Sequence, residues 1–473
     1  MRAIADHPDV SILTAAAALL TAALACGLLA PALFEMLLAA TVLACLGFLA
    51  FRFPTQSCVL WLLVTGMSLE MAFADWVGDA AYQPVIAVIK AIGIGLGCLC
   101  VLRFGPKLDL LCPAWGFVAM LLTGLAHGLY PGLTATESLR SAIGSIAPFV
   151  FCFARLPPHW AEAIIRAAKW CPVVAVAACL PLAAVGLRPL FVDSGGARLA
   201  GLGHPAFLAN VCLPAIYACL IQLYREGRRG DLGLLIANGL ILLLTGARAP
   251  LFYAIAVCGI SLLSIRSRQF AARDRILLVL SVLALLPMLV LFAGAFSEVR
   301  LFNVMANEAG NLSGRDLLWP EFEAAAARSL WFGWGVGAGN VVIPPDSAIV
   351  QQMHTWAAHN EYLRIGVEGG LLGRALLIAL FAAWVFVRSR DLPAADRRIM
   401  RLAFLAYAGH AATDNVLIST PACVMFAFTA AVFARPSLRP SHPSPVPNFA
   451  RPILRPSQTS PVPNFARPRF RPS

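Results

Sequence analysis

The chain has 473 residues, of which 60% are hydrophobic and only 13% are charged, and its mean hydropathy is +0.78. Soluble domains carry about a quarter charged residues, so this composition excludes an ordinary soluble domain and indicates an integral membrane protein. The net charge of +12 would suit a nucleic-acid-binding protein. However, half of that excess comes from six arginines that follow Arg435 without any acidic residue, so no nucleic-acid interface is predicted.

Apolar runs follow one another along residues 1–434, which we interpret as one polytopic membrane domain. About 17–25 apolar residues cross a hydrocarbon core as a helix, and helices are expected because backbone groups in lipid must pair internally. The sequence therefore predicts an all-α integral membrane protein, a bundle of about 12–14 transmembrane helices. We place the spans at 11–30, 32–51, 57–74, 84–102, 110–128, 138–153, 171–187, 205–224, 232–246, 249–265, 276–296, 361–387, 402–418 and 420–434.

Arginine and lysine occupy alternate loops between these spans. Positive residues collect on the cytoplasmic side, which predicts that both termini lie in the cytoplasm. The stretch 157–170 is interpreted as an interfacial amphipathic helix. The outer side of the membrane then receives residues 188–204, 245–250 and one large loop at 297–360. Loops of that length are usually functional, and an amphipathic helix is expected in it through Leu317–Ala327.

Residues 435–473 differ from the rest of the chain. A nine-residue sequence from Ser444 recurs from Ser460, and the segment is rich in Pro, Arg and Ser. Such a composition cannot form a packed core, so a disordered tail is predicted. The thirteen cysteines lie mostly in apolar runs without Cys-x-x-Cys or Cys/His ligand spacing. They are interpreted as core residues, and the sequence predicts no disulfide, metal site or cofactor.

Three arginines on the outer side are candidates for binding a phosphate-carrying lipid. Arg248 lies between two apolar runs, where a charge is costly unless it is paired or faces a watery cavity; the alternative is an arginine that reaches the headgroups. Arg198 lies in a Gly-rich loop before a helix that Pro205 begins, although a plain surface turn also explains that loop. Arg315 follows Ser-Gly in the large loop. Guanidinium groups pair with phosphate through two parallel hydrogen bonds. His204, beside the first of these loops, is interpreted as a capping residue.

The large loop also carries aromatic and histidine candidates. Trp319 and Trp334 are candidate platforms for sugar rings, whereas the alternative is a loop whose tryptophans lie at headgroup level. His359, in His-Asn-Glu-Tyr-Leu, is the candidate general base, since a neutral imidazole can take a proton from an attacking hydroxyl. His354 is the second candidate for that base, and the neighbouring Asn360 is a secondary site candidate.

In this order and topology, the sequences around Arg198, Gly246-Ala-Arg248, Ser313-Gly-Arg315, Gly333-Trp-Gly-Val-Gly and His359 resemble the O-antigen ligase and O-antigen polymerase superfamily. The resemblance covers residues 195–375. It implies a metal-independent, inverting glycosyltransferase with a GT-C-like fold in the bacterial inner membrane. The active site and the large loop would then lie in the periplasm.

The resemblance also implies substrates and roles. The donor would be a glycan on undecaprenyl pyrophosphate, His359 the base, and Arg198, Arg248 and Arg315 the pyrophosphate-binding residues. The leading hypothesis is an O-antigen ligase with lipid A-core as acceptor, and the nearest alternative is an O-antigen or exopolysaccharide polymerase. A membrane transporter is the alternative from another class; it predicts broken helices at matching positions of two repeated halves.

Overall fold

The computed structural model describes residues 45–434, apart from residues 46, 79–81, 194–195, 268–269, 277, 281–314 and 354. Contacts divide the chain into two units, residues 1–436 and residues 437–473, and every described residue belongs to the first. The expected spans at 11–30 and most of 32–51 and 276–296 lie outside the described residues, as do His354 and the tail.

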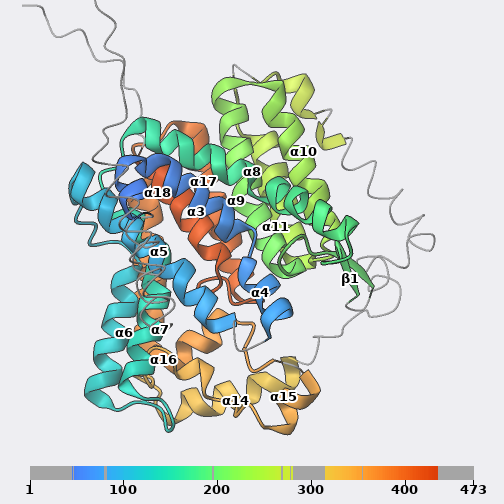
Figure 1. The fold of residues 1–473 in the computed structure, drawn as a ribbon. Coiled ribbons are helices and arrows are strands. Elements are labelled where there is room, and N and C mark those ends of the chain that lie inside the picture. The colour runs from blue at the N-terminus through green and yellow to red at the C-terminus, as the bar shows by residue number, and fades with distance from the viewer. Residues whose placement is uncertain are drawn as a thin grey trace, which may run out of the picture. The chain divides into compact units, whose positions relative to one another are not determined.

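The described part of the first unit is helical apart from one two-stranded hairpin and the connecting loops (Figure 1). Its N-terminal half holds α3 Pro54–Gly66, α4 Leu69–Val77, α5 Tyr82–Phe104, α6 Ala114–His127, α7 Ala135–Ile146, the 3-10 helix η2 Ala147–Phe153 and α8 Pro158–Ala184. The antiparallel hairpin of β1 Phe191–Asp193 and β2 Ala197–Leu199 follows. The remaining elements are α9 Pro205–Glu226, α10 Arg229–Leu244, α11 Arg248–Ser264, α14 Arg315–Arg328, η3 Ala338–Asn340, α15 Ala348–Met353, α16 Glu361–Arg388, α17 Ala394–Ala411 and α18 Pro421–Phe433.

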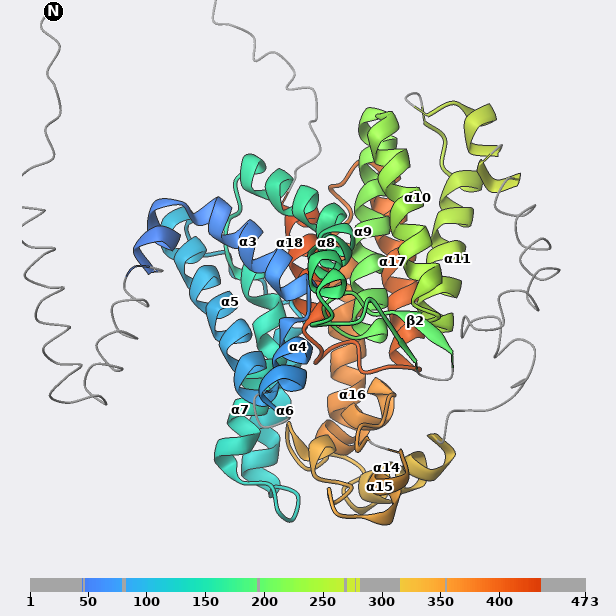
Figure 2. The same cartoon turned by 45° about the vertical axis from the view of Figure 1, so that its right-hand side comes forward.

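Helix α9 lies at the centre of the bundle. It packs against α8, α10, α11, α17 and α18, and nearly all of its residues from Leu208 to Tyr224 are buried. A helix that is apolar all round is buried on all sides, which is why this segment takes the central place. Figures 1 and 2 show α9, α10 and α11 running side by side.

Four helices among the described residues are long and apolar enough to cross a membrane: α5, α8, α9 and α16. A fifth possibility is the pair α3 and α4, which is bent by 57°. The bend falls at Met67 and Ser68, where Ser68 has φ +53° and interrupts the expected straight span at 57–74. The expected total of 12–14 spans stays a prediction.

Two expected boundaries are wrong. The amphipathic helix expected at 157–170 and the span expected at 171–187 are one continuous helix, α8, although Pro172 lies inside it. The span expected at 402–418 ends at Ala411, and residues 412–420 form a loop before α18. The apolar residues 416–418 within this loop led hydropathy to extend the expected span beyond Ala411.

The loops alternate between the two ends of the bundle. At one end Arg225 of α9 pairs with Asp396 at the start of α17, and Arg398 donates to the carbonyl of Ser264 at the end of α11. At the other end Arg198 of β2 donates to the carbonyl of Thr245, which follows α10. The arginine-rich loops and the loops expected on the outer side therefore belong to opposite ends of these helices.

A break in α16 holds the region 315–360 in place. Gly370 has φ +60° and ψ −160°, values that interrupt the helix. The exposed backbone groups are then paired with the chain at 330–335: Leu371 and Leu372 donate to the carbonyls of Leu330 and Trp331, and the carbonyls of Val367 and Glu368 accept from Trp334 and Gly335. A helix break without such partners would leave buried polar groups unsatisfied.

This region has an apolar core of its own. Leu318, Phe322 and Ala325 of α14 pack with Ala338, Val342 and Ile343 and with Val367 of α16. The expected helix through Leu317–Ala327 is confirmed, since α14 spans Arg315–Arg328. In Figure 2, α14 and α15 lie together below the first turns of α16. The segment is a packed layer on the helix bundle.

Candidate functional site

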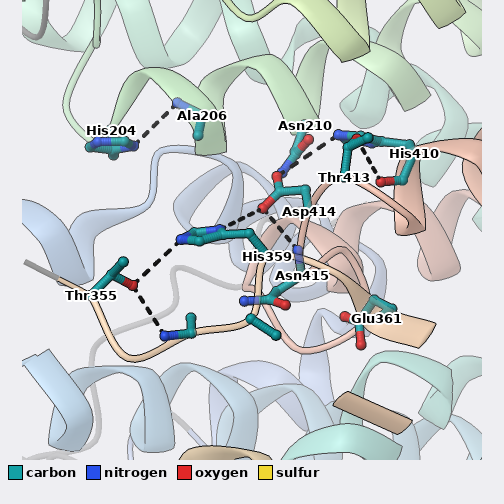
Figure 3. A network of polar contacts seen from close by, with 12 residues as sticks. His204, Ala206, Asn210, Thr355, His359, Glu361, His410, Thr413, Asp414 and Asn415 are labelled. Atoms are coloured by element: carbon teal, nitrogen blue, oxygen red, sulfur yellow. Dashed lines mark hydrogen bonds and ion pairs between the residues drawn. The ribbon is translucent and has the colours of Figure 1, made fainter. Parts of the chain in front are cut away.

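His359 lies two residues before α16, which begins at Glu361, in the loop that follows α15. Its backbone has φ +47°, a left-handed conformation that few residues other than Gly, Asn and Asp adopt. Its side chain is about one third exposed. Nδ1 lies 3.4 Å from Oδ1 of Asp414, and Nε2 lies 3.4 Å from Oγ1 of Thr355 (Figure 3). The imidazole is thus held between a carboxylate and a hydroxyl.

Asp414 is the centre of this network. Besides His359, it accepts a hydrogen bond of 3.1 Å from Nδ2 of Asn210, and its Oδ2 lies 3.8 Å from Nε2 of His410. Burial raises the pKa of Asp414, but the hydrogen bond from His359, the charges of His410 and His359 and the hydrogen bond from Asn210 outweigh burial and hold that pKa well below its usual range. Asp414 is therefore ionised at neutral pH and can only accept hydrogen bonds.

The loop that carries Asp414 is fixed by three buried charged side chains. Glu361, the first residue of α16, accepts from the backbone N–H of Leu417 at 2.7 Å. Lys90 of α5 donates to the carbonyl of Ile418 at 2.9 Å. Glu70 of α4 accepts from the hydroxyl of Thr420. Because each anchor comes from a different helix, the position of Asp414 depends on the packing of the whole bundle.

Arg198 and Arg248 both lie at the turn between α10 and α11. Arg198 is largely buried, and its Nε–H donates to the carbonyl of Thr245 at 2.7 Å. The turn continues through Gly246, which has φ +66°, to Arg248, the first and exposed residue of α11. Arg198 thus stabilises the turn that presents Arg248, a role that the loop composition did not reveal.

Arg315, the first residue of α14, lies in the same electrostatic neighbourhood. Burial lowers the pKa of its guanidinium, the Asp414 carboxylate raises it, and the positive charge of Arg248 lowers it. Three segments that are far apart in the sequence therefore act on one another here. Asp414 is the acidic group common to them, so the neighbourhood keeps an excess of positive charge that suits an anionic ligand.

His204 adjoins the same group of residues. Its Nδ1 accepts from the N–H of Ala206, which confirms the capping role expected for it at the start of α9. Burial lowers its pKa, and so do the charges of Arg198, His359 and Arg188, while Asp414 raises it. In Figure 3, His204 and Ala206 lie above the group formed by Thr355, His359 and Asp414. His204 is therefore neutral at pH 7.

The remaining sequence candidates have structural contacts. Asn360 is the N-cap of α16, and its Oδ1 accepts from the N–H groups of Tyr362 and Leu363. The indole N–H of Trp319 donates to Ala358, and that of Trp334 donates to Ala325. Both rings pack against the apolar core of the 315–360 region. These contacts hold the loop in which His359 lies.

Asp414, Asn210 and Thr355 were missed in the sequence. Asp414 and His410 fell inside an expected span, and a charged residue at that depth is itself a signal of function. That signal was present and could have identified Asp414. Nothing in the local sequence indicates that Asn210, within an apolar run, bonds to it.

Residues 233–378 match the family model described as O-antigen ligase. This match supports the resemblance to the O-antigen ligase and polymerase superfamily, which is thereby confirmed. The matched range includes Arg248, Arg315 and His359, whereas Arg198 and Asp414 lie outside it. No curated protein sequence matches the chain. The O-antigen ligase family implies glycosyltransferase-like activity on lipid-linked glycans in general.

Proposed function

We propose that the chain is an O-antigen ligase, which moves a glycan from undecaprenyl pyrophosphate to a sugar hydroxyl of lipid A-core at the periplasmic face of the inner membrane. The observation that carries this proposal is the pairing of His359 with Asp414 beside Arg248 and Arg315. A base next to a cationic site is what attack on a sugar phosphate ester requires.

His359 acts as the general base in this proposal. The ionised Asp414 can only accept, so it favours the tautomer in which Nδ1 carries the proton and Nε2 keeps its lone pair. The Thr355 hydroxyl beside Nε2 marks the direction from which an acceptor hydroxyl approaches. As the acceptor oxygen attacks the anomeric carbon, its proton moves to Nε2, and Asp414 stabilises the imidazolium that forms. Attack from the face opposite the leaving group inverts the anomeric centre.

The arginines act on the leaving group. When the glycosidic bond to phosphate breaks, negative charge develops on the undecaprenyl pyrophosphate. Arg248 is exposed and Arg315 is partly buried, so both can approach the pyrophosphate, and Arg198 holds the turn that presents Arg248. Fixed positive charges in a partly dry site stabilise such a leaving group strongly. The proposed step uses neither a metal nor a nucleotide.

A polymerase of the same superfamily is the second candidate. It would use the same base and the same arginines, but its acceptor would be a second lipid-linked repeat. A transporter would need unpaired backbone groups at its helix breaks to hold a substrate. In the break of α16, the carbonyls of Val367 and Glu368 are instead bonded to the chain at 334–335. This observation favours the enzyme.

Reconstitution tests the proposal. The purified chain in liposomes receives a glycan on undecaprenyl pyrophosphate, with either lipid A-core or additional lipid-linked repeats as acceptor, and the products are separated on a gel. The ligase proposal predicts glycan on lipid A-core. Longer lipid-linked chains without that product would identify the polymerase, and no transfer to either acceptor would reject both enzymes.

A further inference from the structure

A small hollow lies between α9, α17 and α18, next to the loop that carries Asp414. It has room for about one water-sized molecule, and most of its wall is apolar. Four polar side chains also line it: Asn210 of α9, Tyr407 and His410 of α17, and Ser419 of the loop before α18. The Tyr407 hydroxyl already donates to the carbonyl of Val416. Asn210 and His410 contact Asp414 as well, so the hollow and the carboxylate share these two residues.

The polar atoms that face away from Asp414 are unsatisfied. Because Nδ2 of Asn210 donates to Asp414, its Oδ1 is turned away, and this oxygen is buried with no hydrogen-bond partner among the described residues. His410 is 1% exposed, and its Nδ1 has no partner within the described part of the chain. The buried Oγ of Ser419 is in the same situation with respect to the described residues. Buried polar groups in native proteins are seldom left in this state.

Two of these three atoms, Oδ1 of Asn210 and Nδ1 of His410, are hydrogen-bond acceptors, and the third, Oγ of Ser419, can donate. Nε2 of His410 faces a carboxylate that can only accept, so Nε2 carries the proton and Nδ1 is an acceptor. Oδ1 of Asn210 is a second acceptor, and the hydroxyl of Ser419 can donate. A water molecule has two hydrogens to give and lone pairs to receive, and buried waters usually make about three hydrogen bonds to such groups.

We propose that this hollow is a binding site for a buried water molecule, which donates to Asn210 and His410 and accepts from Ser419. The water fixes the two side chains that hold Oδ2 of Asp414, and this keeps Oδ1 directed at His359. His410 and Asn210 are thereby positioning residues for the transfer reaction, so this inference rests on the function proposed above. The other titratable groups around His410 are Tyr253 of α11, Tyr407 of its own helix and the nearby charge of Arg315.

A density map of the full chain at a resolution that shows ordered waters tests the site directly. We expect one water peak within hydrogen-bond distance of Asn210 Oδ1, His410 Nδ1 and Ser419 Oγ. A hollow without density, or one filled by a rotated side chain, would overturn the inference. This result does not depend on any activity, so it stands even if the chain proves not to be a glycosyltransferase.

Variants test the positioning role in the reconstituted reaction. His410→Leu removes both nitrogens, and we expect kcat to fall on the order of 10- to 100-fold with KM little changed, because a misplaced catalytic group costs that much. His410→Gln keeps a donor for Asp414 and an acceptor for the water, so it should recover most of that loss. Ser419→Ala, the mildest change, should lower kcat in the same direction if His410→Leu does not fold.

Asn238→Leu is the matched control. Asn238 of α10 is also fully buried, and its Oδ1 likewise has no partner among the described residues, but its amide donates to Lys169 rather than to Asp414. We expect its kcat to equal that of the wild type even if its thermal stability is lower. A wild-type kcat in both His410→Leu and Ser419→Ala would contradict the positioning role, whereas an inactive wild type would instead reject the proposed function.

Discussion

At the residue scale, the position of one carboxylate decides what His359 can do. A histidine in a loop beside three arginines would be repelled as it became charged, and its proton could sit on either nitrogen. Asp414 selects the tautomer because it accepts a hydrogen bond from Nδ1. Its negative charge beside the ring also stabilises the charged imidazole. The proposed reaction would therefore depend on a residue that lies 55 positions away from His359 in the sequence.

Replacing Asp414 by Asn tests this dependence. Asn is nearly isosteric, but it removes the charge and offers an N–H group that can force the other tautomer of His359. We expect kcat for glycan transfer to fall on the order of 10²-fold or more, as when the orienting acid of a catalytic triad is removed. The measurement is the initial rate in liposomes at saturating acceptor. A rate within a factor of two of the wild type would show that Asp414 has no such role.

His204 gives a prediction for stability against pH. Its pKa in the folded protein is below the ordinary value of 6.5, so below that pH the unfolded chain binds a proton that the folded chain does not. Stability must then decrease as the pH falls from 6.5 toward the folded pKa. His204→Asn keeps a good N-cap without a titrating group, and it should show a smaller decrease over this range.

The measurement is the thermal unfolding midpoint in detergent between pH 7.5 and pH 4.5. Asp414 does not affect this comparison. The pKa of its carboxyl is lowered in the folded protein, so its contribution to stability is lost only as the pH falls below the ordinary value of 3.8. Parallel curves for the wild type and His204→Asn would contradict the burial of a neutral imidazole.

At the scale of elements, the break in α16 connects the site to its support. The turn at 330–335 pairs with the chain around Gly370, and the same region ends in His359 and Asn360, which begin α16. A hydropathy profile records α16 as one apolar run, so the break was not predicted. Its cause is a contact between backbone segments that only the glycines permit.

Gly370→Ala should disrupt this connection. A Cβ at that position would lie 2.5 Å from the carbonyl carbon of Trp331, and φ +60° is already unfavourable for alanine. We expect a loss of at least about 1–3 kcal/mol of stability from backbone strain, and lower transfer activity as the loop shifts. The measurement is the unfolding midpoint followed by tryptophan fluorescence.

Gly366→Ala is the control within the same helix. A Cβ there meets only the end of the Arg374 side chain at 3.7 Å, and helical geometry suits alanine. This variant should be as stable as the wild type or more stable, by about 0.5–1 kcal/mol. Equal effects of Gly370→Ala and Gly366→Ala on stability would mean that the break at Gly370 does not require a glycine.

At the scale of the whole molecule, the features that local sequence determines were predicted better than those that depend on contacts between distant residues. Long apolar runs identified α5, α9 and α16, and Pro205 marked the start of α9. The alternation of basic loops agrees with the two ends of the bundle, as the pairs Arg225–Asp396 and Arg198–Thr245 illustrate. These features follow from hydropathy and charge, which each segment carries by itself.

The site was only partly visible in the sequence. Arg248, Arg315 and His359 could be selected because each is a polar residue at an unusual position, and the structure brings them into one neighbourhood. The roles of Asn360, Trp319 and Trp334 as caps and packing groups depend on contacts that no local pattern encodes. The same reason hid Asp414, whose position is set by Glu361, Lys90 and Glu70 from three other helices.

The most direct test of the proposed function replaces His359, the proposed base. His359→Asn is the sharpest variant, because Asn tolerates the positive φ of this residue and removes only the imidazole. The measurement is the single-turnover rate of glycan transfer in liposomes, with His127→Ala as a control for an exposed histidine at the end of α6. We predict that His359→Asn inserts and folds normally but transfers on the order of 10²- to 10⁴-fold more slowly, while the control keeps the wild-type rate. Transfer by His359→Asn at the wild-type rate would contradict the proposed function.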